Sequence, residues 1–211
     1  MGAAIENLTI SEAAVAAGVT VAKVNRMIDK RILPKMLYKA SENRTVRKEA
    51  CLWIAFYFET EDVLTSSARI KAMRSVLGHK YSWDELRQCK FEESRAVQVV
   101  LSSIWDDVER RLSQLRAAQD LVIEDPEILR GIPVIRGTRI PVYDVASLVD
   151  AGTPLEELRE IYPKLRPSQI ELASVYAKAT PLRGRPRRQQ MPKSLSISIS
   201  KKRLRSSSTG G

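Results

Sequence analysis

Apolar residues recur at helical spacing along most of this chain, and this period predicts a mainly α fold of the α+β class with a few short strands. Near the N-terminus a helix should run through Ala17, with Thr9 or Ser11 as its cap and Glu12 in its first turn. Gly18 follows, and glycine most easily takes the positive φ that a helix end requires.

A second helix should begin after this glycine turn. Thr20 can cap it, and Val21, Val24 and Ile28 follow the helical period. A helix, a glycine turn and a helix make the outline of a DNA-binding helix-turn-helix. Its outer side should present residues suited to phosphates and base edges, namely Thr20, Lys23, Asn25, Arg26 and Lys30.

Residues 32–48 contain two short runs around the turn-forming Ser41-Glu42-Asn43, which predicts a β-hairpin wing. Arg44 and Arg47 on this wing join the predicted DNA-binding set, and Lys35 and Lys39 should also point outward. The alternative is a structural helical hairpin with a solvated basic face, because short helix-turn-helix patterns also arise by chance.

The middle of the chain predicts core and connecting elements. Residues 48–59 are apolar almost all round and should form a buried helix, and residues 65–78 carry a capping threonine and a closing glycine. Residues 95–101 should form a strand. The next twenty residues predict an amphipathic helix with Ile104, Val108, Leu112 and Leu115 on one side.

Short strands and three helices should follow, the helices over residues 142–151, 154–161 and 167–179. Residues 150–161 can be laid over residues 16–27, with glycine on glycine at the turn. The first copy offers cations, whereas the second offers Glu156, Glu157 and Glu160. Carboxylates facing phosphates would weaken DNA binding. The second copy is therefore predicted to bind protein, either another copy of the chain or a partner.

The charge is distributed unevenly. The chain has 35 basic and 25 acidic residues, for a net charge of +10, and nine basic residues but no acidic ones follow Thr180. Residues 1–180 therefore hold 26 basic and 25 acidic residues and are nearly neutral. This asymmetry indicates that the C-terminal tail binds a polyanion.

Nothing in the pattern predicts an enzyme or a cofactor. Cys51 and Cys89 lack a metal-binding spacing, so a reduced, buried thiol is expected at Cys51. His79, the only histidine, has no carboxylate or nucleophile motif beside it. Neighbouring acids such as Asp106 and Asp107 point to different helix faces. With no apolar run long enough to span a bilayer and no export signal, a cytoplasmic location without membrane contact is expected.

The C-terminal third resembles the family of VapB-type antitoxins that bears the label DUF 433. The match covers about residues 120–180 and rests on Gly131, Pro133, Gly137, Thr138, Arg139, Ile140, Pro141, Val142, Gly152, Tyr162 and Pro163. The N-terminal region is similar to a MerR-type helix-turn-helix. The resemblance to VapB-type antitoxins implies an antitoxin of a type II toxin–antitoxin system. Such a protein binds a PIN-like ribonuclease toxin, blocks its metal-dependent site, and represses its own operon as a homodimer or higher oligomer.

The turn at Arg136, Gly137, Thr138 and Arg139 is predicted to belong to the protein-binding surface, together with the three glutamates. The alternative function is a stand-alone transcriptional regulator with a C-terminal sensing or dimerisation domain. The expected organisation is a winged helix-turn-helix over residues 1–80, a connecting strand and helix over 81–120, the antitoxin-type domain over 121–180 and a basic tail over 181–211.

The tail resembles an AT-hook in its core, formed by Arg183, Gly184, Arg185 and Pro186 and followed by Arg187 and Arg188. Such a core inserts arginines into a narrow minor groove. Leu182 replaces the usual proline, and the alternative is a disordered tail that binds any phosphate. Farther on, Leu195, Ile197 and Ile199 alternate with serines, which predicts either a strand that pairs with a partner's sheet edge or a disordered segment.

Overall fold

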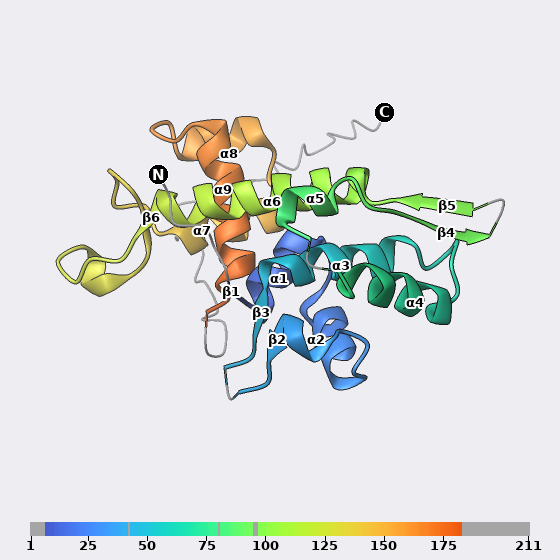
Figure 1. Ribbon diagram of the computed structural model, residues 1–211. Helices are drawn as coiled ribbons and strands as arrows, with labels where there is room; N and C mark the ends of the chain where they lie inside the picture. The colour runs from blue at the N-terminus through green and yellow to red at the C-terminus, as the bar shows by residue number, and fades with distance from the viewer. Residues whose placement is uncertain (1–6, 42, 80, 95–96, 183–211) are drawn as a thin grey trace, which may run out of the picture. The chain divides into compact units, whose positions relative to one another are not determined.

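Helices dominate the computed structural model, which describes residues 7–41, 43–79, 81–94 and 97–182 (Figure 1). Small antiparallel sheets accompany them, so the predicted mainly α fold of the α+β class is confirmed. The helices are α1 (Ile10–Ala17), α2 (Val21–Asp29), α3 (Lys48–Glu59), α4 (Ser66–Leu77), α5 (Trp83–Leu86), α6 (Ser102–Leu121), α7 (Val142–Asp150), α8 (Leu155–Ile161) and α9 (Pro167–Ala179), with 3-10 turns η1 (Lys35–Leu37) and η2 (Leu129–Gly131). The strands are β1 (Asn7–Thr9), β2 (Tyr38–Lys39), β3 (Thr45–Arg47), β4 (Lys90–Ser94), β5 (Val97–Val100), β6 (Val122–Ile123) and β7 (Val134–Ile135).

The predicted N-terminal helix, turn and helix are confirmed. Thr9, rather than Ser11, caps α1: its Oγ1 accepts a hydrogen bond from the Glu12 N–H at 3.3 Å, and the Glu12 carboxylate accepts one from the Thr9 N–H at 2.7 Å. Gly18 takes a φ of 68° after α1. Thr20 caps α2 by accepting the Lys23 N–H at 3.3 Å.

A three-stranded antiparallel sheet stands beside these helices, in the order β1-β3-β2. The predicted wing is confirmed as the β2–β3 pair, in which Tyr38 lies opposite Val46. The sequence did not predict β1, which lies on the other side of β3 with Leu8 opposite Val46. Leu8 and Val46 are both fully buried, so this small sheet is part of the core.

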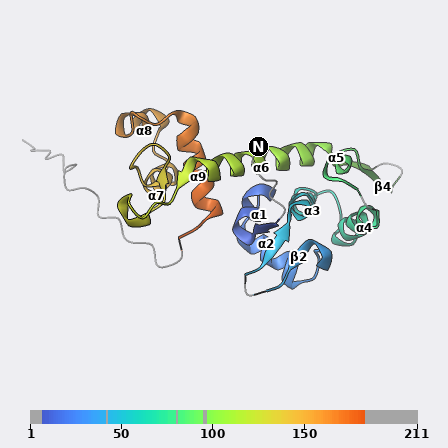
Figure 2. The same cartoon turned by 60° about the vertical axis from the view of Figure 1, so that its left-hand side comes forward.

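Helix α6 connects two hydrophobic cores. Its predicted apolar side, formed by Ile104, Val108, Leu112 and Leu115, is buried in the first core, against α1 and α3. Ala118, close to its C-terminal end, belongs to a second core with α7 and α9. Figure 2 shows α6 as one long helix that reaches from α5 to α9. The chain up to Pro181 forms one unit, and the predicted limits at residues 80 and 120 stay a prediction.

The second core is formed largely by buried residues of the predicted C-terminal helices. Strands β6 and β7, which precede α7 in the chain, pair with one another, and α9 packs against α7, α6 and α1. Tyr143 on α7 donates a hydrogen bond to the Thr180 carbonyl at 2.6 Å, and Asp150 pairs with Lys178 at 3.3 Å. These contacts hold both ends of α7 on α9.

Two elements of the middle region were not predicted from the sequence. Strand β4 pairs with the predicted β5, and α5 packs on α6 through two tryptophans. The Trp105 indole N–H donates to the Trp83 carbonyl at 2.8 Å, and the Trp83 indole N–H donates to Glu109 at 2.7 Å. The closing Gly78 of α4 has an ordinary right-handed φ of −65°. In the described part of the chain, no helix has the length and apolar character needed to cross a membrane.

Candidate nucleic-acid and protein interfaces

Helix α2 and the wing lie next to one another at one edge of the unit that ends at Pro181 (Figures 1 and 2). Arg26 on α2 and Lys30, which directly follows its last residue, are exposed, and neither forms an ion pair within the part of the chain that the structure describes. Val24, Met27 and Ile28 hold the opposite side of the helix in the core. The two predicted DNA-binding cations are therefore available on the outer side of α2.

Other predicted DNA-binding residues have structural partners. Lys23 is only half-exposed, because its ammonium lies 4.6 Å from the centre of the Phe58 ring and 3.9 Å from the Glu61 carboxylate. The Thr20 hydroxyl is the helix cap. Both residues therefore have contacts within the fold at the start of α2, and their predicted DNA-binding role stays a prediction.

The wing arginine Arg44, expected to point outward, instead turns back onto α2. Its Nη1 donates to Asp29 Oδ1 at 2.8 Å and to Asn25 Oδ1 at 3.3 Å. This bond fixes the position of the Asn25 amide oxygen. Arg47 remains largely exposed and pairs with Glu49 at 3.2 Å. Arg44 thus braces the wing against α2.

A hollow of about 350 Å³ adjoins the wing and has residues from all three strands in its wall. Lys39 and Arg47 bring positive charge to it, and the Met36 side chain beside them is 62% exposed. Asn7 completes the wall from β1. Asn7 and Met36 were not predicted to line a surface hollow, since β1 itself was not predicted.

The turn that joins β7 to α7 contains the sequence block Gly-Thr-Arg-Ile-Pro-Val. Gly137 takes a φ of 75°, which only glycine adopts easily. The Thr138 hydroxyl donates to the Ile135 carbonyl at 2.7 Å and accepts the Ile140 N–H at 3.0 Å. Pro141 precedes the first turn of α7, and Val142 is fully buried. These residues shape and anchor the turn.

The two arginines of this region behave differently. Arg136 closes the end of α6: its Nε donates to the Asp120 carbonyl at 2.9 Å and its backbone N–H to the Leu121 carbonyl at 2.8 Å. Arg136 thus has a structural role at this helix end, and its predicted partner-binding role stays a prediction. Arg139 is exposed, and among the residues with described positions it forms no ion pair.

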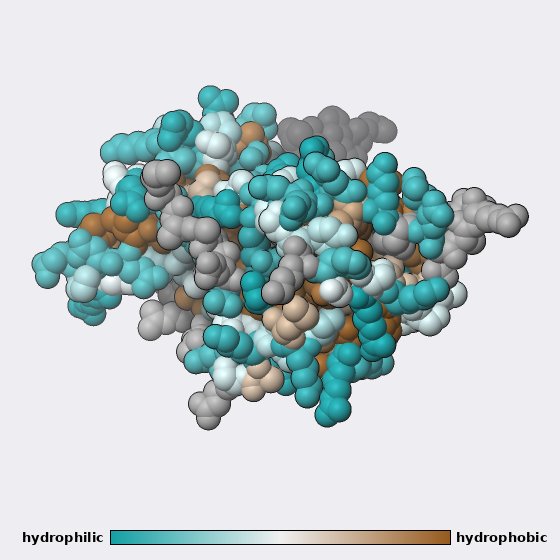
Figure 3. Space-filling view, in the orientation of Figure 1, coloured by the Kyte–Doolittle hydropathy of each residue, from teal (hydrophilic) through white to brown (hydrophobic). Residues whose placement is uncertain are grey.

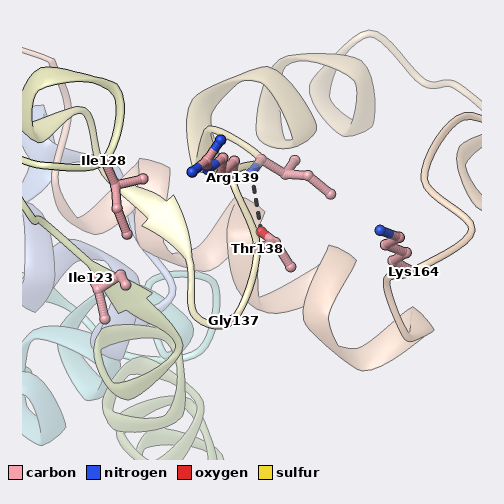
Figure 4. A pocket seen from close by; sticks show the side chains of 7 residues that line it. Ile123, Ile128, Gly137, Thr138, Arg139 and Lys164 are labelled. Atoms are coloured by element: carbon pink, nitrogen blue, oxygen red, sulfur yellow. Dashed lines mark hydrogen bonds between the residues drawn. The ribbon is translucent and has the colours of Figure 1, made fainter.

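A pocket of about 700 Å³ opens beside this turn (Figure 4). Ile123, Ile128 and Ile140 give it apolar walls, and Arg139 and Lys164 bring two positive charges to it. Figure 4 shows the two labelled isoleucines on one side of the turn and Lys164 on the other. The sequence did not indicate Lys164, because a lone lysine in a loop has the pattern of an ordinary solvated residue.

Helix α8 carries the predicted acidic surface. Glu156, Glu157 and Glu160 are all exposed, and no ion pair holds them within the described ranges. Leu155 and Ile161 are 38% and 47% exposed, and Leu158 is the buried residue of the helix. In both ribbon views α8 lies at the opposite edge of the unit from α2. Figure 3 shows further hydrophobic surface around β6 and η2, where Leu129 and Ile132 are exposed.

Reactive groups outside these surfaces have structural surroundings. Cys51 is a free thiol, fully buried as expected, and burial raises its pKa to about 12. His79 is exposed and lies 3.1 Å from the Ser75 carbonyl through Nδ1. Asp106 bonds Arg87 and Asp107 bonds Arg110, and these arginines lower the pKa of both carboxyls. The two neighbouring acids therefore serve different ion pairs.

The tail residues of the AT-hook-like core, Arg183 to Arg188, and the alternating Leu195, Ile197 and Ile199 lie outside the described residues. Their predicted contacts stay predictions.

Comparison with known proteins identifies a family match in the C-terminal part and one relative along most of the chain. Residues 122–177 match the family described as "Protein of unknown function (DUF433)". The crystal structure of Rv2018 from Mycobacterium tuberculosis covers 79% of this chain and 95% of its own, at 19% identity and a TM-score of 0.27, which is too low to carry an argument about the fold. The uncharacterized protein y4eO of Sinorhizobium fredii is 42% identical over 193 residues, which are 89% of this chain and 87% of that protein. This chain belongs to the same family as y4eO, and its residues 122–177 form a DUF433 module.

Proposed function

We propose that this chain is a DNA-binding antitoxin that represses its own operon and neutralises a PIN-like ribonuclease toxin. DNA binding is the part that the geometry supports best. The observation that carries it is the pairing of two exposed cations, Arg26 on α2 and Lys30 at its C-terminal end, with an adjacent wing braced by Arg44. Within the described part of the chain neither cation forms an ion pair.

In this proposal α2 enters the major groove, which is about 12 Å wide and admits a helix. Arg26 and Lys30 contact base edges or phosphates. Lys39 and Arg47 on the wing contact the neighbouring backbone, where cations set the register of a protein on DNA. The MerR-type likeness of this region agrees with such a docking. Arg44 supports it indirectly, since its bonds to Asn25 and Asp29 hold helix and wing in one arrangement before DNA arrives.

The toxin-binding part of the proposal rests on the DUF433 module. Its pocket combines apolar walls with Arg139 and Lys164, and its α8 exposes carboxylates beside Leu155 and Ile161. Surfaces that mix exposed large apolar side chains with charge are typical of protein-binding sites. The resemblance to VapB-type antitoxins supplies the kind of partner.

The basic tail adds DNA affinity in this proposal, and an AT-hook-like core would favour A·T-rich flanks. Each phosphate that it neutralises steepens the log–log salt dependence of binding by about 0.9. Truncation after Thr180 should therefore flatten that slope. If the tail instead covers a toxin's active site, truncation will impair neutralisation and leave the salt slope unchanged.

Two measurements test the function. The first is binding of the full chain to the DNA upstream of its own gene, compared with a shuffled fragment of equal length and composition. The second is co-expression with the product of the neighbouring gene, followed by co-purification and a ribonuclease assay. Specific DNA binding without any co-purifying nuclease would favour the alternative, a stand-alone regulator in which the 700 Å³ pocket binds a small ligand. Equal affinity for both fragments would contradict the DNA-binding part.

A further inference from the structure

Arg139 is exposed in its sequence block, and it forms no ion pair with any residue in the described ranges. Gly137 supplies the positive φ, Thr138 ties the turn together, and Val142 is buried. The Arg139 guanidinium, in contrast, is exposed at the edge of the pocket. A side chain with no role in shaping the turn is free to bind something else.

The pocket sets the chemistry of its occupant. Two cations at an apolar hollow fit a partner that offers carboxylates next to aliphatic side chains. The chain's own tail is a poor candidate, because the sequence after Leu182 carries nine cations and no acid. Helix α8 has the required composition, with Glu156, Glu157 and Glu160 beside the exposed Leu155 and Ile161.

The α8 of the same chain does not fill this role. Lys164 follows α8 by only a few residues, yet no ion pair joins the three glutamates to Arg139 or Lys164 among the residues that the structure describes. Both halves of a complementary contact therefore lie on one module, and neither half forms an ion pair with the residues whose positions are described.

We propose that a second copy of this chain seats the acidic, apolar face of its α8 against the pocket formed by Arg139, Lys164 and the isoleucines, and that the exchange is reciprocal. The inference rests on the proposed protein-binding role of the DUF433 module and names its partner. A two-fold axis between the modules applies each contact twice, as isologous dimers do. The α2 surfaces, at the far edge of each unit, stay open to DNA.

The test uses two charge-reversed forms of the full chain. The first form carries Arg139→Glu and Lys164→Glu, and the second carries Glu156→Lys, Glu157→Lys and Glu160→Lys. Alone, each form faces like charge with like charge, so its dimer should dissociate at least about tenfold more readily than the wild-type dimer. Mixed together, the first form's acidic pocket meets the second form's basic helix, and the reverse contact is the unaltered pairing of basic pocket and acidic helix. A 1:1 heterodimer should therefore return to near wild-type stability.

Sedimentation velocity or light scattering over a concentration series gives the dissociation constants. Glu171→Lys, on the exposed side of α9, is the matched control for a change of charge away from both surfaces and should dimerise normally. Circular dichroism and thermal unfolding show whether each variant is folded. A form that fails to fold is replaced by its milder version, with Arg139→Gln and Lys164→Gln or with the three glutamates changed to Gln.

The outcomes separate this inference from the proposed function. A wild-type chain that stays monomeric, or reversed forms that dimerise as well as wild type, would overturn the inference. Reversed forms that dimerise normally but no longer bind toxin would also overturn it, while leaving the antitoxin proposal intact and assigning these surfaces to the toxin. Loss of dimers in both forms with recovery on mixing supports the reciprocal contact.

Discussion

Two helix-turn-helix units lie in the part of the chain before Pro181. The first unit is formed by α1 and α2 and the second by α7 and α8, and they make the same turn with different consequences. Gly18 has a φ of 68° and Gly152 a φ of 80°. In both units the residue after the glycine donates its N–H to the helix carbonyl five positions back, at 2.9 Å in the first and 3.1 Å in the second. The similarity of residues 16–27 and 150–161 in sequence is therefore a similarity of backbone geometry.

The helices after these turns differ in how much of their surface is buried. Val24 and its counterpart Leu158 are both buried. Three residues farther on, Met27 is fully buried, whereas its counterpart Ile161 is 47% exposed. Helix α2 therefore lies closely on its core and presents a polar outer side, while α8 keeps apolar surface available. The turn fixes the backbone path, and the residues around it determine what each second helix can bind.

The two units also differ in the charge of their second helix, and reversing the charge on α2 should cause the largest effect, a loss of DNA affinity. Arg26→Glu and Lys30→Glu together place two acids on the outer side of α2, where the second unit has Glu160 at the position equivalent to Arg26. Removing one contact to a base costs about 1–3 kcal/mol, and a like charge facing phosphate adds to this. We expect a loss of DNA affinity of at least about a hundredfold, measured by fluorescence anisotropy on the upstream fragment.

The control for this change is Arg159→Ala, which removes an exposed arginine from α8 and should leave DNA affinity unchanged. Lys23→Ala should have a smaller effect than Arg26→Ala, since Lys23 already contacts Glu61 and Phe58. If Arg159→Ala weakened binding and the reversed α2 did not, the assignment of the two units would have to be exchanged.

The two glycines give the next effect, on stability. An alanine with positive φ costs about 1–2 kcal/mol relative to glycine. At Gly152 a Cβ would meet no atom within 4 Å, so Gly152→Ala should cost only this amount. At Gly18 a Cβ would lie 2.8 Å from the guanidinium carbon of Arg111, which must move away from Glu59 and Asp107. Gly18→Ala should therefore be the more destabilising change in urea unfolding.

A double-mutant cycle isolates the contribution of Arg111. In an Arg111→Ala background, Gly18→Ala and Gly152→Ala should destabilise the chain by the same amount. A difference that persists without Arg111 would show that the two turns are not equivalent in their backbones.

The periodicity of apolar residues was sufficient to predict the long helices of the chain. Helix α6 has four apolar residues at regular spacing. Thr9 and Thr20 cap the starts of α1 and α2, and Gly18 marks the end of α1. These signals are local, because helix hydrogen bonds join residues four apart. The short strands were different. Strand β1 has three residues, of which Leu8 alone is buried, and its partner Val46 lies far along the chain.

The candidate sites depended on tertiary contacts in the same way. The sequence pointed to Arg26, Lys30 and the three glutamates, and their exposure agrees with it. It did not show that Arg44 turns back to Asp29, because that contact requires the wing to fold onto α2. Lys164 likewise reaches the pocket of Arg139 only through the packing of the module. Composition identifies candidate residues, while packing decides which of them are free.

The caps give a smaller effect with opposite signs in the two units. Thr20→Ala removes the side chain that accepts the Lys23 N–H and should destabilise the chain by about 1 kcal/mol. The second unit has Pro154 at this place, with no side-chain cap. Pro154→Ser supplies a hydroxyl and should leave stability unchanged or raise it by a few tenths of a kcal/mol. Equal destabilisation by both changes would mean that the proline contributes as much as the threonine cap.

Alkaline pH gives the smallest effect, since it is absent at neutral pH. Each core holds one group whose pKa is raised to about 12: burial does this to Cys51 in the first core, and burial with the nearby Tyr143 and Glu124 does it to Tyr176 in the second. A raised pKa means that the neutral form is favoured in the folded state, so the stabilisation is complete below the ordinary pKa and is lost as pH rises toward 12. The loss should begin near pH 9 for the thiol and near pH 10 for the phenol, whose ordinary pKa values are 9.0 and 10.0.

Urea unfolding between pH 8 and pH 11 should therefore show a shallower decline of the free energy of unfolding in Cys51→Ala from pH 9 upward, and in Tyr176→Phe only from pH 10 upward. Lysines and exposed tyrosines titrate in all three proteins and cancel when each variant is compared with wild type. Variants that decline in parallel with wild type would show that neither group is kept from ionising by its core, and the two cores would then have no difference in their response to alkali.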